Sequence, residues 1–138
     1  MIIDKNLQLS DAQAVTASAA STNVIDLGAA YQEVAQGGML HLVVSVPTTV
    51  TAAGAATVTV ALQQSADNST YTDVVVSPAI GKASLAAGAQ VVLPVPPGLA
   101  SRYLRAYYTV ATGPLTAGTF SANIVSGIQQ SRAYPDAL

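Results

Sequence analysis

The residue types that carry most enzymatic chemistry are scarce in this chain of 138 residues. Cysteine is absent, which excludes disulfides, thiolate metal ligands and thiol nucleophiles. The one histidine, His41, has no second imidazole with which to share a metal ion, and no serine lies in a Gly-x-Ser-x-Gly context. The seven carboxylates fall in segments expected to be arm, turn or tail: Asp4, Asp11, Asp26, Glu33, Asp67, Asp73 and Asp136. We therefore expect no enzyme, no catalytic residue, no metal site and no cofactor.

A row of aromatic and basic side chains is the best candidate for a binding surface. In the segment YLRAYYTV, alternation puts Tyr103, Arg105 and Tyr107 on one face of an expected strand. Tyrosine and arginine are enriched at the centres of protein interfaces. Such a row could also stack against a sugar, although tryptophan, the usual choice, is absent. With Arg132 and Tyr134 of the C-terminal tail, these are the candidate protein-interface residues, and the residue types alone leave a sugar ligand open.

Charge is the most informative feature of the composition. Charged residues make up 9% of the chain, where about 25% is usual, while hydrophobic residues make up 51%. The formal net charge is −2 and the basic residues are scattered along the chain. We therefore expect neither nucleic acid nor an anionic membrane as a partner. Because a surface with so little charge tends to associate, we expect partner proteins to cover much of it.

The N-terminus and the apolar runs give no sign of a targeting or membrane segment. The charged pair Asp4 and Lys5 interrupts the stretch in which a secretory signal would need an unbroken apolar core. No apolar run approaches the roughly 18 residues of a membrane span. We expect a protein made in the cytoplasm, free or bound to an assembly.

The elements that position these residues are predicted to be half-buried β-strands. Alternation of apolar and polar residues recurs in MLHLVVSV (39–46), TVTVALQQ (57–64), VVLPV (91–95), YLRAYYTV (103–110) and FSANIVS (120–126). In the first of these, His41 and Val43 are expected to face outward. Glycine, proline and the polar stretch ADNS lie between the strands, and ADNS predicts a hairpin that pairs 58–64 with 71–76. One-sided strands with regular turns indicate an all-β antiparallel sandwich or jelly roll.

Three parts of the chain are expected. Residues 1–22 are predicted to be an extended N-terminal arm, although SDAQ (10–13) has the form of a helix capping box. Residues 23–126 would form the sandwich, beginning with a strand over 23–27, and 47–57 is expected to be a mobile loop. Residues 127–138 form a short tail without a pattern, either flexible or a strap that docks on an assembly.

Several segments together resemble a known family. They are DKNLQLSDAQAVTASAASTNVIDLG (4–28), LQQSADNSTYTDV (62–74) and RYLRAYYTVATGP (102–114). In pattern and order they are similar to the jelly-roll capsid cement proteins of tailed bacteriophages, of the Bordetella phage type. The resemblance implies a decoration protein on the outer surface of an icosahedral capsid with the HK97-type shell fold. It also implies a homodimer that clamps neighbouring subunits of the major capsid protein, and it carries over no individual contact residue.

These expectations together describe a structural protein of a phage virion that is not an enzyme. The alternative function is a carbohydrate-binding or host-attachment module of the same fold on the virion. A third possibility is a self-polymerising pilin-like or tail-fibre subunit.

Overall fold

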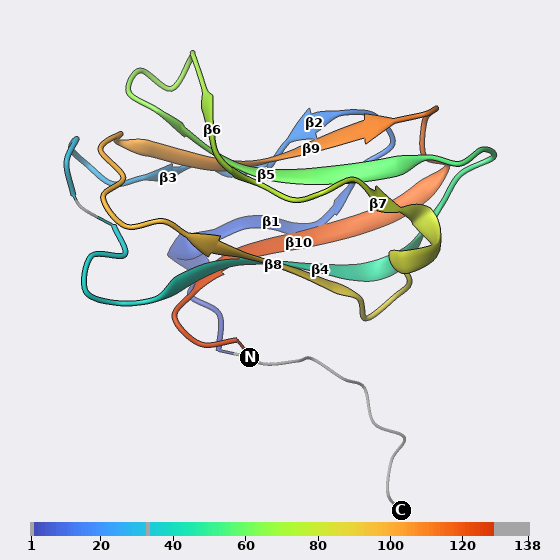
Figure 1. The fold of residues 1–138 in the computed structure, drawn as a ribbon, viewed down its shortest axis with the longest axis horizontal. Helices are drawn as coiled ribbons and strands as arrows, with labels where there is room; N and C mark the ends of the chain where they lie inside the picture. Colours follow the sequence, from blue (N-terminus) through green and yellow to red (C-terminus); the bar gives the residue numbers. More distant parts are fainter. Residues whose placement is uncertain (1, 33, 129–138) are drawn as a thin grey trace, which may run out of the picture.

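The computed structural model of the chain describes residues 2–32 and 34–128. Its strands form two antiparallel sheets that face each other, as Figure 1 shows. The four-stranded sheet has the order β1 (Gln8–Ala14), β10 (Ala117–Val125), β4 (Leu40–Thr51), β8 (Gln90–Val95). The six-stranded sheet has the path β2 (Ala19–Ala20), β9 (Tyr103–Ala111), β5 (Thr57–Ser65), β6 (Thr72–Val76), while β3 (Ile25–Asp26) pairs with β9 and β7 (Ile80–Gly81) with β5. The predicted all-β sandwich is confirmed.

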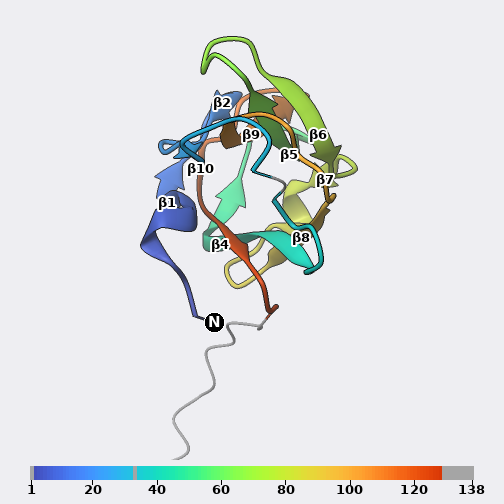
Figure 2. The same ribbon diagram turned by 90° about the vertical axis from the view of Figure 1, so that its left-hand side faces the viewer.

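The order of the strands is that of a jelly roll. Strands β2 and β3 lie along β9 as two pieces of one edge, and β6 and β7 lie along β5 in the same way. With these pairs merged, eight strand positions remain, four in each sheet. Every connection between consecutive positions crosses from one sheet to the other, except the β5–β6 hairpin. This is the connectivity of a jelly roll, in which eight antiparallel strands form two sheets. Seen end on, the two sheets curve around a common interior (Figure 2).

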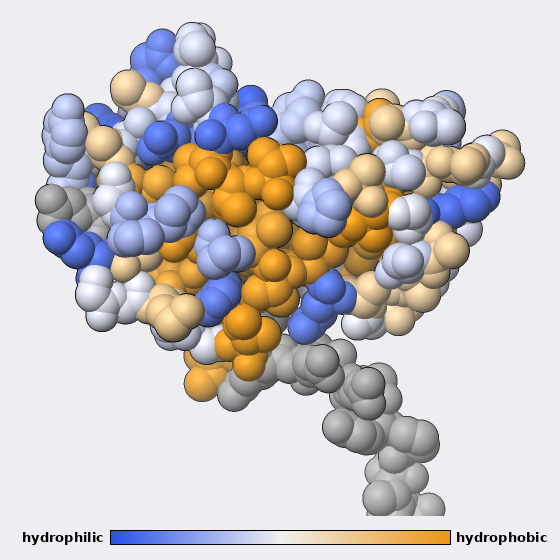
Figure 3. All heavy atoms as spheres, viewed as in Figure 1, coloured by the Kyte–Doolittle hydropathy of each residue, from blue (hydrophilic) through white to orange (hydrophobic). Residues whose placement is uncertain are grey.

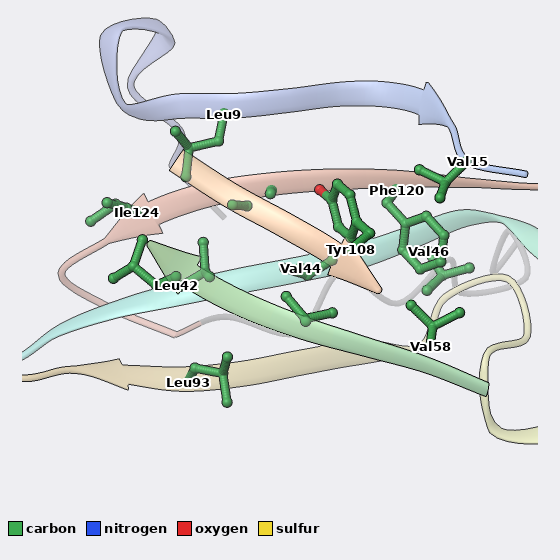
Figure 4. Packing of buried hydrophobic residues seen from close by; sticks show 14 of the residues in the cluster. Leu9, Val15, Leu42, Val44, Val46, Val58, Leu93, Tyr108, Phe120 and Ile124 are labelled. Carbon is green, nitrogen blue, oxygen red and sulfur yellow. The ribbon is translucent and has the colours of Figure 1, made fainter. Parts of the chain in front are cut away.

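The core fills the space between the sheets with the inward residues that alternation predicted. Tyr108 of β9 and Phe120 of β10 lie at its centre, with ring centroids 5.1 Å apart (Figure 4). Offset aromatic pairs of this kind add about 0.5–1.5 kcal/mol beyond the area they bury. The hydroxyl of Tyr108 donates a hydrogen bond of 2.9 Å to Ser10 of β1, so this buried hydroxyl has a partner in the opposite sheet. Burial raises the pKa of Tyr108 to about 12, with the hydrogen bond to Ser10 acting in the opposite direction.

The outward residues of β4 lie on the predicted side, but one of them is fully buried there. His41 is half-buried on the outer side of the four-stranded sheet, as predicted, but Val43 is completely buried. Val43 sits in an inner strand between Asn123 of β10 and Val92 of β8, and Asn123 is also almost fully buried. The predicted side is therefore right, since Val43 lies outside the core cluster between the sheets, but alternation does not say which neighbouring side chains cover the outer side.

The segment 47–57, predicted to be a loop, is a strand in its first part, and only residues 52–56 form the connection between β4 and β5. Strand β4 continues to Thr51, and Val50 is buried in the core. Pro47 is accommodated at a shift in the pairing of β4 with β10, which is where sheets tolerate proline. Gly118 lies against Val50 with φ +143°, and a Cβ built on it would come within 2.9 Å of the Val50 side chain. The close approach of the two backbones, which the composition does not reveal, accompanies the continuation of β4 to Thr51.

The expected arm is partly integrated into the sandwich. Residues Gln8–Ala14 are extended, as predicted, and no helix forms at SDAQ, but they pair with β10 as an edge strand. Strand β2 then adds to β9 in the other sheet, so the boundary of the domain lies well before residue 23. Residues Lys5–Leu7 form the short 3-10 helix η1, and Lys82–Ser84 form a second one, η2. The predicted strand over 23–27 is present as β3.

The predicted hairpin is confirmed. Strands β5 and β6 pair antiparallel from Ala61↔Val76 to Gln64↔Thr72, with an irregularity next to Leu62. At the tip, one carboxylate oxygen of Asp67 accepts hydrogen bonds from the backbone N–H groups of Ser69 and Thr70. Asn68 adopts φ +57°, a conformation that asparagine tolerates well. The hairpin rises above the six-stranded sheet in Figure 1.

Candidate protein-binding surface

The predicted interface row lies on the outer face of the six-stranded sheet. Tyr103, Arg105 and Tyr107 are half-buried on β9, while Leu104, Ala106 and Tyr108 between them are buried in the core. The row therefore faces away from the core, as alternation predicted. Arg132 and Tyr134, the other two candidate residues, lie outside the described residues.

Small or polar residues of β5 lie directly opposite this row. Tyr103 pairs with Ser65, Arg105 with Gln63, and Tyr107 with Ala61. Ser65 and Ala61 are almost fully buried although they belong to the outer face. Large side chains on β9 next to small ones on β5 produce a surface on which the tyrosines and the arginine are the prominent groups.

A fourth residue joins the row from the hairpin. The guanidinium carbon of Arg105 lies 3.6 Å from the ring centroid of Tyr71 and 5.4 Å from that of Tyr107. The Tyr71 hydroxyl hydrogen-bonds to Asn68 at the tip, and burial raises the pKa of Tyr71 above its ordinary value. We call Tyr71, Tyr103, Arg105 and Tyr107 the tyrosine–arginine face.

A line of hydrogen bonds crosses the sheet beneath this face. Arg105 Nε donates to Gln63 Oε1 at 2.8 Å, and Gln63 Nε2 donates to Asp73 Oδ1 at 2.8 Å. The three residues are cross-strand neighbours on β9, β5 and β6. The guanidinium is thus held on one edge by an amide and on one face by an aromatic ring.

An ion pair lies beside Tyr103, at one end of the tyrosine–arginine face. Arg102 donates to both carboxylate oxygens of Asp26, from Nε at 2.6 Å and from Nη2 at 2.8 Å, and its guanidinium lies 5.0 Å from the Tyr103 ring centroid. The hydrogen bond from Arg102, followed by one from the Gly28 N–H, lowers the pKa of Asp26 to about 2. Both side chains are about half exposed, so the pair contributes little stability on its own.

Sequence reasoning missed Tyr71, Gln63 and Asp73 as members of this surface. The predicted hairpin already pairs the strands that carry Gln63 and Asp73, and alternation puts Gln63 outward. The pattern does not predict that β9 pairs with β5, which brings Arg105 beside Gln63. It also does not predict that the Tyr71 ring lies against Arg105.

A second surface feature is an apolar patch at the edge of the sandwich where β6 and β8 lie. Figure 3 shows hydrophobic residues gathered in the middle of this side. Val76 of β6 is 48% exposed, and other members are half-buried: Val74, Val75, Ile80 and Val91. Among residues 2–32 and 34–128, both β6 and β8 are edge strands of their sheets.

His41 lines an apolar groove of about 450 Å³ with Met39, Pro94 and Pro96. Its Nδ1 atom is buried and has no hydrogen-bond partner among residues 2–32 and 34–128. Across the same described residues, no group of three or more His, Cys, Asp and Glu side chains is placed to hold a metal ion. No helix in that part of the chain has the length and apolarity to cross a membrane.

Comparison with known proteins places the chain in a family. No curated protein matches the sequence. The profile of the Bbp16 family, a name that points to a Bordetella phage protein, matches residues 9–124, from β1 to the end of β10. The match spans nearly all of the sandwich, and the chain belongs to the Bbp16 family.

Proposed function

We propose that this protein is a non-enzymatic capsid cement protein, a structural component on the outer surface of a tailed-phage virion. In this role it binds the major capsid protein of the assembled shell and clamps neighbouring subunits. The observation that carries the proposal is the membership in the Bbp16 family over residues 9–124.

The surface chemistry supports docking onto protein. The chain is nearly uncharged for its size, and the tyrosine–arginine face offers residues of the kind found at interface centres. A fixed contact on a lattice does not require long-range electrostatic steering, so a low charge is no disadvantage there. The exposed edges of β6 and β8 would be covered in the assembly.

The proposal includes a homodimer. A single contact with the shell can be weak, but a dimer with two contacts gains effective concentration for the second one. Because the dimer would bind the assembled lattice and not the free subunits, it would stabilise the assembled state by mass action. No nucleic acid, membrane or cofactor takes part.

The direct test is decoration of shells that lack this protein. Purified protein is mixed with expanded shells assembled from the major capsid protein of the same phage, and the mixture is sedimented. We expect saturable binding to the outer surface and a higher temperature of shell disruption. Absence of binding, with no change in the disruption temperature, would contradict the proposal.

The alternative, a carbohydrate-binding or host-attachment module, predicts a different outcome for the same surface. One side of each ring in the tyrosine–arginine face is already close to a guanidinium group, which leaves less of the rings for a sugar. If Tyr103→Ala with Tyr107→Ala abolishes binding to glycans and leaves shell decoration unchanged, the module function replaces the cement function. If the same change releases the protein from shells, the surface is a protein interface.

A further inference from the structure

Arg105 is held in a fixed orientation before any partner binds. Its Nε atom donates to Gln63, which is itself anchored by a hydrogen bond to Asp73. The ring of Tyr71 covers one side of the guanidinium plane at 3.6 Å. Because arginine ordinarily loses much side-chain freedom on binding, an arginine held in this way has less entropy to lose.

The hairpin tip keeps Tyr71 in place over Arg105. Asp67 accepts hydrogen bonds from Thr70, Ser69 and Ser65, and these bonds hold its pKa below the ordinary value. Tyr71 follows directly and bonds to Asn68 of the same tip. The ring is therefore supported by an ordered turn.

Within the part of the chain that the structure describes, most of the hydrogen-bond donors of Arg105 have no partner. The ion pairs within the described part of the chain are Lys5–Asp11 and Arg102–Asp26, so Arg105 has no carboxylate partner there. Only its Nε has a hydrogen-bond partner among those residues, which leaves the donors on its two terminal nitrogens available. Arg102 differs, because both oxygens of Asp26 already occupy its fork.

We propose that Arg105 binds a carboxylate side chain of the major capsid protein, an Asp or Glu, through its terminal nitrogens. The guanidinium fork matches a carboxylate geometrically, and such charge-assisted pairs are the strong hydrogen bonds of interfaces. Tyr71 and Tyr107 lie beside the guanidinium and would shield the pair from water, which would strengthen it. This inference rests on the proposed cement function and names the chemistry that the partner must supply.

The test measures the affinity of the full-length protein for expanded shells. Arg105→Gln is expected to weaken binding about ten- to hundredfold, the loss expected for a charge-assisted pair. Arg105→Lys should restore only part of the affinity, because lysine keeps the charge but lacks the fork. Arg102→Gln is the matched control with an occupied fork, and it should change the affinity by less than about threefold.

A chemical arm identifies the group on the shell. Shell carboxylates are converted to neutral amides with a carbodiimide and glycinamide before the protein is added. The difference between wild type and Arg105→Gln should then vanish, since the wild-type protein no longer finds its carboxylate. A difference of the same size on untreated and amidated shells would overturn the inference. Thermal unfolding of each variant checks that the fold is intact.

Failure of this inference is distinguishable from failure of the cement function. If the wild type binds shells and Arg105→Gln binds equally well, the carboxylate pair is wrong and the cement function stands. If no variant binds shells, both are wrong. If shell binding persists and Arg105→Gln dissociates the protein into monomers in sedimentation, the carboxylate belongs to a second copy of the chain. If shell binding persists and Arg105→Gln removes binding to an acidic glycan, the carboxylate belongs to a sugar. Either result overturns the inference.

Discussion

The guanidinium of Arg105 on β9 lies 3.6 Å from the ring centroid of Tyr71, which follows the tip of the β5–β6 hairpin. This contact connects the candidate row on the sheet to a polar turn that is far away in the sequence. It makes the hairpin part of the candidate binding surface.

Replacing Tyr71 tests this contact. Tyr71→Ala should lower the free energy of unfolding by about 0.5–1 kcal/mol, the usual contribution of an exposed cation–π contact. The side-chain protons of Arg105 should also lose the upfield NMR shift that the ring produces. Tyr71→Phe is the matched control, since it keeps the ring and removes only the hydrogen bond to Asn68. Equal Arg105 shifts in wild type and Tyr71→Ala would contradict the contact.

The pair Asp26–Arg102 should be visible in a titration. The pKa of Asp26 is lowered to about 2 from 3.8. Because the folded state lowers this pKa, the pair's contribution is present above pH 4 and is lost as the pH falls from about 4 to about 2. Carboxyl NMR titration should give the low value in wild type and a higher one in Arg102→Gln. An Asp26 pKa near 3.8 in the wild-type protein would show that the pair does not form in solution.

Gly118 should tolerate no side chain. A Cβ at this position would lie 2.9 Å from Val50 Cγ2, and φ is +143°, so Gly118→Ala should destabilise the protein by about 1–3 kcal/mol. Gly81→Ala is the control, because nothing lies within 4 Å of a Cβ there and φ is −66°. Urea denaturation measures both variants. A stability loss shared equally by the two would refute the close approach of β10 and β4.

Tyr108 should give the stability a characteristic dependence on alkaline pH. At pH 7, Tyr108→Phe loses the hydrogen bond to Ser10 and should be less stable by about 1 kcal/mol. Folding raises the pKa of Tyr108 from 10.0 to about 12, so its contribution is complete below pH 10 and falls as the pH rises from 10 toward 12. The deficit of Tyr108→Phe should therefore shrink over this range. A deficit constant to pH 11.5 would argue against a buried hydroxyl.

The sequence predicted the parts of this structure that depend on local pattern. The two-residue period assigned the inward residues of the core strands and the outward row on β9, and the stretch ADNS placed the hairpin. Prediction from the sequence failed where contacts between distant segments determine the local structure. Gln8–Ala14 has no strong strand pattern of its own, and becomes β1 because β10 offers it an edge. Val50 is buried because Gly118 allows the opposite backbone to come close.

The candidate surface likewise contains residues that a local pattern predicts and residues that it does not predict. Tyr103, Arg105 and Tyr107 could be read from one strand, since alternation is a property of a single segment. Tyr71, Gln63 and Asp73 could not be joined to them, because their proximity depends on which strands are neighbours in the sheet and on how the hairpin leans. Cross-strand contacts of this kind follow from topology, which a local pattern does not encode.

A density map of intact phage particles would show where this protein sits in the virion. We predict copies of this jelly roll on the outer surface of the shell, each in contact with more than one subunit of the major capsid protein. Density for the chain inside the shell, on the tail alone, or nowhere on the particle would contradict it.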